Sequence, residues 1–261
     1  MATWDTTSTY YSGQGVVLVG ERDAQGRPLG LRPVGNVSAL SISIETSTLE
    51  HKESQSGQRA IDMRLTTETK ANLSMTLESF SRQNLALAFR GDGVLIAAGS
   101  VTGYPTTFRG GLVMPLGHVQ VSAVVVKKGA ATLVAKSGSG NWDYDVNPAA
   151  GSILFNGDSG SRATSGLVEG DALTVDYAYA AQARIEALTQ PAQERFLRFE
   201  GLNTLDGNKP VVVEVPRFLV DPAKEYALIT GEEVAGFELA GSVLADGLIT
   251  SGSKFFRQLM I

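Results

Sequence analysis

Apolar and polar residues alternate along much of this chain, which is the period of a strand with one covered face. Leu40, Ile42 and Ile44 fall on one side of such a run, and Ser41 and Ser43 fall on the other. The alternation therefore predicts a half-buried strand in this part of the chain.

The same period continues from residue 61 onward. Apolar residues share one face on either side of a turn that we expect near Lys70, and polar residues occupy the positions between them. The pattern predicts a long antiparallel hairpin that is buried on one side and wet on the other. Its apolar positions are Ile61, Met63, Leu65, Leu73, Met75 and Leu77.

A short helix is predicted over residues 81–90, directly after the hairpin. Ser81 is a suitable N-cap, Leu85 and Leu87 supply apolar surface, and Gly91 is a suitable stop. We expect this helix to pack on the apolar face of the hairpin.

The pattern changes near Leu112 to short β runs separated by Gly, Ser, Asn and Asp turns, and longer strands return after residue 182. Such spacing predicts a small all-β module. We therefore expect an inserted β module at 113–182. The flanking segments 1–112 and 183–261 would form the main domain, with an N-terminal arm at 1–15.

Composition narrows the classes of function. The chain has no cysteine, which excludes disulfides, iron–sulfur clusters and thiolate zinc sites. Its 27 acidic and 22 basic residues give a net charge of −5, which disfavours binding to a nucleic acid backbone. No apolar run approaches the roughly 18 to 20 residues that cross a bilayer, and the first residues lack a secretory signal. We expect a cytoplasmic protein without a membrane segment.

The segment 47–62 is an unusually polar connection between two strongly patterned strands. It exceeds the roughly 2 to 5 residues of an ordinary hairpin loop. The residues leave two interpretations open, a solvated loop and a loop that binds a partner. A metal site is disfavoured because it needs convergent, rigidly held ligands. The candidate interface residues here are Glu50, His51, Lys52, Glu53, Gln55, Arg59 and Asp62.

Two short motifs resemble sites of known chemistry. The run "NGDSGS" contains Ser159 in a serine-protease-like setting with His51 upstream, but the likeness ends after four residues and is typical of a turn. The run "DYDVN" has the spacing of a calcium loop. Pro148 and Leu154 stand where that loop needs Gly and an acid. We expect neither a catalytic residue nor a metal, and we expect the acids of "DYDVN" to lie in water.

The segment "LEHKESQSGQRAIDMRLTTETKANLSMTLESFSRQNLALAF" resembles the N-terminal half of siphophage major tail tube proteins, from long non-contractile tails. The shared pattern is a strand, a long charged loop, two strands and a helix that opens near "NLA". The opening arm and the returning strands after residue 182 are similar as well, whereas 113–182 departs from the minimal family fold. The matching positions are Glu50, Lys52, Glu53, Ser54, Gly57, Arg59, Asp62, Asn84, Leu85 and Ala86.

This resemblance implies a mainly β, tail-tube-type sandwich or barrel with one short α-helix and the inserted β module. It implies hexameric rings whose strands close into a shared multi-subunit barrel, and rings that stack around a tape-measure protein. Tail tip and tail terminator proteins would be further partners, and DNA would pass through the lumen without specific binding. The protein would act in the virion tail after assembly in the host cytoplasm. The resemblance implies no enzyme activity and no cofactor.

In such an assembly the 47–62 segment would be an inter-ring or inter-subunit contact. Tyr10 and Tyr11 on the arm suit a groove of a neighbour. Phe255 and Phe256 lie near the end of the sequence, where exposed aromatic residues indicate either contact with a partner or late docking.

Three alternatives stay open. The first is a tube protein of a contractile phage tail or of a secretion-type injection system. The second is a serine hydrolase that uses Ser159 and His51. The third is a carbohydrate-binding β protein, for which Trp4 and Trp142 would be a sparse aromatic platform.

Overall fold

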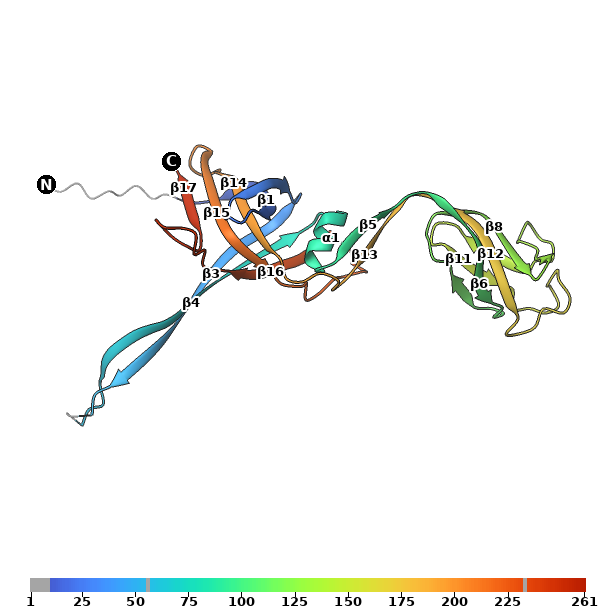
Figure 1. Ribbon diagram of the computed structural model, residues 1–261, viewed down its shortest axis with the longest axis horizontal. Helices are drawn as coiled ribbons and strands as arrows, with labels where there is room; N and C mark the ends of the chain where they lie inside the picture. The colour runs from blue at the N-terminus through green and yellow to red at the C-terminus, as the bar shows by residue number, and fades with distance from the viewer. Residues whose placement is uncertain (1–9, 55–56, 232–233) are drawn as a thin grey trace. The chain divides into compact units, whose positions relative to one another are not determined.

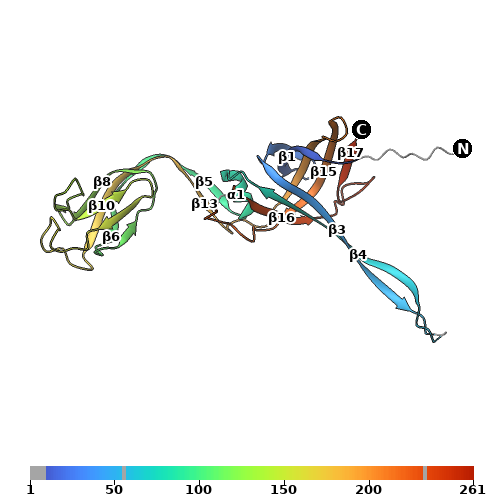
Figure 2. The same ribbon diagram turned by 180° about the vertical axis from the view of Figure 1, so that it is seen from behind.

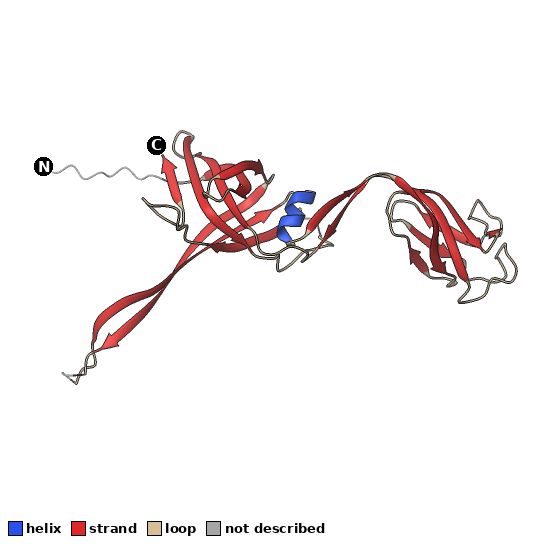
Figure 3. Ribbon diagram, viewed as in Figure 1, coloured by secondary structure: helices blue, strands red, loops and turns tan. Residues whose placement is uncertain are grey.

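The computed structural model describes residues 10–54, 57–231 and 234–261. Strands account for 53% of the residues and helix for 3%, so the protein is mainly β as predicted (Figure 3). The chain divides into two compact units, residues 1–93 with 185–261, and residues 94–184.

The first unit is built on one large antiparallel sheet (Figure 1). The order along it is β2–β1–β14–β15–β16–β4–β3, and β17 also pairs with β15. Its strands are β1 (Gly13–Arg22), β2 (Pro28–Pro33), β3 (Val37–Lys52), β4 (Ile61–Leu77), β14 (Glu194–Asn203), β15 (Lys209–Val220), β16 (Phe237–Val243) and β17 (Arg257–Met260).

The two ends of this sheet lie close together. Strands β2 and β3 are its opposite ends, yet only residues 34–36 separate them in sequence. A link of this length spans roughly 14 Å when fully extended. The backbone N–H of Val34 donates to the carbonyl of Val17 (3.0 Å), and that of Glu78 donates to the carbonyl of Asn36 (3.0 Å). The sheet is therefore curled into an open barrel.

Side chains from both ends of the sheet meet in one core inside the curl. Burial of this apolar surface is the main stabilising term, at about 25 cal/mol per Å². Phe255 and Phe256 lie against the core and are partly buried. The buried members are Val17, Val19, Val34, Ala71, Leu73, Met75, Leu77, Ala88, Leu197, Val215, Phe218, Val220, Phe237, Leu239 and Val243.

The helix α1 (Arg82–Ala88) closes one opening of the curl. The Ser81 hydroxyl accepts a hydrogen bond from the backbone N–H of Asn84 (3.2 Å), which confirms the predicted N-cap. The helix ends at Phe89, before the predicted stop at Gly91.

The buried side chain of Asn84 connects the helix to the edge of the sheet. Its amide donates to the carbonyls of Val34 (2.6 Å) and Ser79 (2.9 Å), and its oxygen accepts from the Arg32 guanidinium (2.8 Å). A buried amide with all these partners fixes the helix position, because an unpaired polar group would be costly there.

The predicted turn near Lys70 is wrong. Strand β4 runs without a break through Lys70, and its partner is β3. The chain reverses between Glu53 and Ala60, where the N–H of Glu53 donates to the carbonyl of Ala60 (2.8 Å). The polar run at 66–70 suits an exposed strand as well as a turn, because β-branched threonines favour strands.

The second unit is a β-sandwich with a core of its own. Its buried side chains include Val126, Val175, Ile153 and Phe155, which come from both sheets. The first sheet contains β6 (Gly99–Thr107), β12 (Ala172–Tyr179), β8 (Val121–Lys128) and β9 (Ala131–Thr132), and the second contains β10 (Tyr144–Asn147), β11 (Ser152–Phe155) and β7 (Val113–Pro115).

This unit begins at Val94, earlier than the predicted boundary at residue 113. The difference arises because β6 pairs with β12 along its length. Local sequence patterns cannot predict such a long-range contact. The chain leaves the first unit in β5 (Asp92–Ile96) and returns in β13 (Gln182–Glu186), and these two strands pair with each other.

The prediction that the acids of "DYDVN" lie in water is wrong for Asp143, which is fully buried. Its carboxylate accepts from the backbone N–H of Val134 (2.8 Å) and from the N–H (2.9 Å) and hydroxyl (2.7 Å) of Thr164. Burial raises the pKa of Asp143, but these hydrogen bonds outweigh it and hold the pKa below its usual value. The carboxylate thus ties loops together as an internal acceptor.

A cluster of ion pairs joins strands of the first unit. Glu194 accepts from Arg22 (3.0 Å) and from two nitrogens of Arg217, and Arg22 also contacts Asp246. The hydrogen bond from Arg217 is the main reason that the pKa of Glu194 lies below its usual 4.5.

The variant Glu194→Gln tests this cluster. We expect the free energy of unfolding to fall by about 1–2 kcal/mol near neutral pH, because charged hydrogen bonds are lost at a partly exposed site. The pKa of Glu194 in the folded protein lies below 4.5. The stabilisation that its carboxylate provides is therefore complete above pH 4.5 and is lost as the pH falls through the folded pKa. Urea unfolding across this range should show the variant and the wild type converging in acid.

A difference that stays constant into strong acid would contradict the assignment. Glu225→Gln, on an exposed loop, is the matched control and should unfold like the wild type at every pH.

Candidate functional site: an uncovered hairpin

The most unusual surface is the outer part of the β3–β4 hairpin, residues 45–52 and 61–70, which we call the distal hairpin. Strand β16 pairs with β4 only from Ala71 to Leu77, so within the described residues the distal hairpin consists of two strands alone. Figures 1 and 2 show no other strand beside it from either side. An isolated two-stranded ribbon is marginally stable in water.

The distal hairpin carries large apolar side chains that nothing in the described chain covers. Leu49 lies opposite Leu65, and Met63 lies opposite His51, so each pair shares a face. Leu49, Ile61, Met63 and Leu65 are each between 52% and 57% exposed. The prediction that Ile61, Met63 and Leu65 are buried is therefore wrong within one chain, because the core ends at Ala71.

Two pairs of charged residues connect the two strands of the distal hairpin. Nδ1 of His51 lies 2.6 Å from Oδ1 of Asp62, and Nε of Arg64 lies 3.8 Å from Oε1 of Glu50. Exposed pairs of this kind contribute about 0–1 kcal/mol each. These pairs help to set the register of the hairpin. They do not cover its exposed apolar side chains.

Half of the predicted loop 47–62 is strand. Residues 47–52 belong to β3 and 61–62 to β4, so the connection shrinks to 53–60. Arg59 has a left-handed backbone with φ 51°, as a tight reversal requires. Gln55 lies outside the described residues. Lys52 is the last residue of β3. Polar side chains occupy both faces of this end of the strand because both faces are exposed, and such a polar run also fits a loop.

The remaining candidate residues separate into two groups. Tyr10 and Tyr11 are exposed, and the carbonyl of Tyr10 accepts from the amide of Asn203 (2.9 Å), which fixes the path of the arm. Phe255 and Phe256 are partly buried against the core of the first unit, which agrees with the docking alternative. Their apolar surface is used within the chain.

The motifs with chemical resemblance occupy ordinary structural positions. Ser159 lies in a turn in which Oδ1 of Asp158 accepts from the N–H of Gly160 (2.9 Å). His51 belongs to the first unit and Ser159 to the second. Among the described residues no group of three histidine, aspartate or glutamate side chains is arranged to hold a metal.

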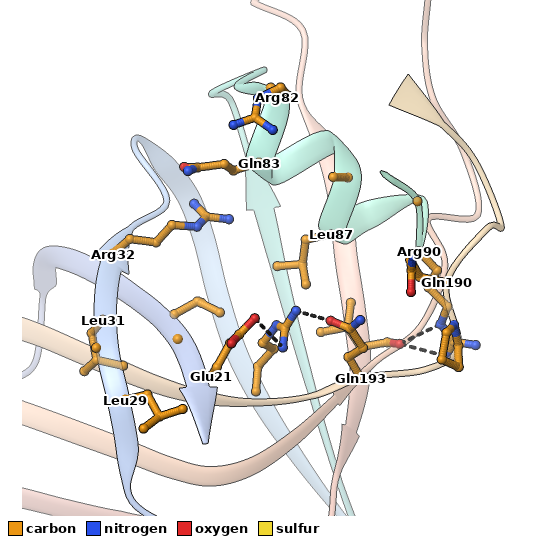
Figure 4. A pocket seen from close by; sticks show the side chains of 18 residues that line it. Glu21, Leu29, Leu31, Arg32, Arg82, Gln83, Leu87, Arg90, Gln190 and Gln193 are labelled. Carbon is orange, nitrogen blue, oxygen red and sulfur yellow. Dashed lines mark hydrogen bonds and ion pairs between the residues drawn. The ribbon is translucent and has the colours of Figure 1, made fainter. Parts of the chain in front are cut away.

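A pocket in the first unit was not predicted from the sequence (Figure 4). Its volume is about 540 Å³, and β1, β2, α1 and the segment before β14 line it. Four arginines and one glutamate are among the residues that line it: Arg32, Arg82, Arg90, Arg195 and Glu21. They come from distant parts of the sequence, so no local motif could have indicated the cluster.

The fold and these surfaces define a mainly β protein with two compact units and an uncovered two-stranded hairpin. Residues 10–259 match the family described as "Protein of unknown function UCP028589", and the chain belongs to that family. The matched range covers both units. No curated protein matches the chain. In the parts that the structure describes, no helix is both long and apolar enough to cross a membrane.

Replacing Met63 and Leu65 together by serine tests whether the distal hairpin is an association surface. We expect the unfolding free energy of the isolated chain to change by less than about 0.5 kcal/mol, because both side chains are exposed. We expect self-association, measured by sedimentation velocity, to weaken at least about tenfold.

The matched control is Leu112→Ser, which removes a side chain of similar exposure in the second unit. If the control and the double variant weaken association equally, the distal hairpin is not a specific contact.

Proposed function

We propose that this chain is a structural subunit of a bacteriophage tail tube, of the long non-contractile type. Copies form hexameric rings, and the rings stack into a tube that serves as the DNA conduit. The observation that carries the proposal is the distal hairpin, because its exposed apolar residues lie on a ribbon without support in one chain.

A neighbouring subunit would supply what the distal hairpin lacks. Burying its four half-exposed apolar side chains against a second copy would remove apolar surface from water at about 25 cal/mol per Å². The exposed charges on the same ribbon favour one register over others. The distal hairpin also lies within the stretch of sequence that resembles tail tube proteins.

The sheet offers a further route to association through its edges. Strand β17 pairs with β15 on one side, and in the described chain no strand pairs with its other side. Leu259 and Met260 on it are exposed. An open edge is a template for a strand from another chain, and closing it in a ring avoids irregular aggregation.

The charge of the subunit suits a DNA conduit. A net charge of −5 repeated around every ring would repel the phosphate backbone and limit adhesion during passage. The tape-measure protein would occupy the lumen during assembly, and tail tip and terminator proteins would bind the two ends of the tube. The subunit would have no catalytic role. A tube protein of a contractile tail is the alternative within the same class.

Negative-stain electron microscopy of the purified full-length chain, concentrated alone and with the tape-measure protein, tests the proposal. We expect rings or tubes with an open lumen. Persistent monomers under all these conditions would overturn it.

A shortened hairpin gives a sharper test of the same idea. Ser47 and Glu68 are cross-strand partners, so replacing residues 48–67 by Asn-Gly leaves a two-residue turn in register. We expect a folded chain, with an unfolding midpoint close to that of the wild type, that no longer forms tubes in the microscope.

The matched control keeps the hairpin apolar with Met63→Leu and Leu65→Ile, and it should retain tubes. Normal tubes from the shortened chain would contradict the role of the distal hairpin.

A further inference from the structure

The outward surface of the barrel changes character from one set of strands to another. On β3, β4 and β16 the outward side chains are short, and Ser41, Ser74 and Ala240 are register partners in one row across these strands. The alternate residues Leu73 and Leu239 point the other way and are buried. This outward face suits contact with water.

The outward face of β1, β14, β15 and β17 is apolar instead. These four strands lie side by side (Figure 1). One cross-strand row contains Val16, Val212 and Leu259, with Glu200 on the strand between the first two, and Leu202 lies in the next row. Val16, Leu202 and Leu259 are 49%, 45% and 53% exposed. We call Val16, Leu202, Val212 and Leu259 the outward patch.

The strands hold the outward patch rigidly in place. Val17, Leu197 and Val211, at alternate positions of the same strands, are buried, so the patch residues cannot turn inward. Beside the patch, Arg198 and Arg257 both donate to the carboxylate of Glu214. Exposed apolar side chains grouped on a rigid face with a charged margin are typical of an interaction site.

The distal hairpin and the outward patch carry matching charges beside their apolar residues. On the hairpin, the side chain of Arg64 is 68% exposed and that of Glu50 is 42% exposed. Beside the patch, the side chain of Arg257 is 67% exposed and that of Glu200 is 48% exposed. Each of these groups already has a partner in its own chain. Pairs between two copies would therefore extend existing pairs and favour one register, rather than supply most of the binding energy.

The size of the hairpin argues for a closed ring of copies. Its β3 side runs over residues 45–52, so one face of the two-stranded ribbon covers on the order of 250 Å². A stable pair of proteins buries about 800 Å² on each partner. Two hairpins packed on each other would therefore be too small a contact for a stable dimer. In a ring, each subunit gives one hairpin and receives another, so two contacts hold it.

We infer that the apolar face of the distal hairpin of one copy packs on the outward patch of a second copy. Leu49, Met63 and Leu65 lie against the patch as the second layer of a β-sandwich, about 10 Å from the sheet. The two surfaces are different parts of the chain, so the contact is heterologous and can close a ring. This inference rests on the proposed function, because it names the surface that receives the hairpin of a tube subunit.

A photo-crosslinker on the hairpin tests the contact directly, since the chain has no cysteine of its own. Leu65→Cys carries benzophenone maleimide and is mixed before irradiation with an equal amount of isotopically heavy wild-type chain. We expect mass spectrometry to find light–heavy cross-links to β1, β14, β15 or β17. They should be at least about tenfold more abundant than those from Leu112→Cys, labelled in the same way in the second unit.

The reciprocal label, on Leu202→Cys, should capture residues 45–52 or 61–70 of the heavy chain. If the light–heavy cross-links from Leu65→Cys reach only other strands, or show no excess over those from Leu112→Cys, the inference is wrong. Cross-links that never join light to heavy chains would also overturn it, because the hairpin would then bind its own chain.

A second measurement removes the outward patch with Leu202→Ser and Leu259→Ser, which leaves the core intact because both side chains are exposed. We expect self-association in sedimentation velocity to weaken about tenfold, as with Met63→Ser and Leu65→Ser. All four substitutions together should weaken it no further, because the two pairs lie in one contact. Effects that multiply to about a hundredfold would assign the surfaces to separate contacts and overturn the inference.

These outcomes separate the inference from the proposed function. Wild-type tubes together with multiplying effects would overturn the inference alone. The expected cross-links without tubes under any condition would support the contact and count against the tail tube. Neither tubes nor light–heavy cross-links would overturn both.

Discussion

The fold of the first unit depends on a three-residue link. Residues 34–36 join the two end strands of a large sheet, and a chain that short cannot connect them unless the sheet curls. Curling brings Val17 and Leu239 into one core and leaves an opening that α1 fills. The buried amide of Asn84 bonds to the carbonyl of Val34 in the link itself, so helix and closure stabilise each other. The pocket beside α1 is a product of the same closure.

The core of the first unit does not extend to the distal hairpin. The core covers the apolar face of β4 from Leu77 back to Ala71. Beyond the polar run at 66–70, Leu65, Met63 and Ile61 repeat the same alternation without a cover. The period of two is the same in both parts of the strand, but their surroundings differ. Exposed apolar side chains on an unsupported ribbon carry a risk of aggregation, which a neighbour that covered them would remove.

Local patterns were sufficient to predict much of the secondary structure. The period of two predicted the strands around Ile42 and Leu73, and the cap at Ser81 was recognised because its hydrogen bond spans only three residues. The same reasoning placed a turn at Lys70, because polar residues on an exposed strand resemble those of a turn. Local patterns could not predict that Asp143 is buried, since its hydrogen-bond partner Thr164 lies far along the chain.

The candidate site was only partly accessible from the sequence. The polar composition of the 47–62 segment indicates a contact surface, but the exposure of Leu49, Met63 and Leu65 follows only from where the core ends. For Phe255 and Phe256 the sequence left a partner contact and docking open, because their burial depends on a tertiary contact. The arginine-lined pocket depends entirely on closure of the sheet, so it has no local signal.

The pairing of β5 with β13 has a consequence for folding. Both ends of the second unit lie side by side, so once that unit has folded it acts as a short bridge between the halves of the first. Strands β1 and β14 then meet across a much shorter effective loop, and each halving of loop length lowers the closure penalty by about 0.6 kcal/mol. We expect early folding of the second unit to speed assembly of the barrel, although it contributes no side chain to the core of the first unit.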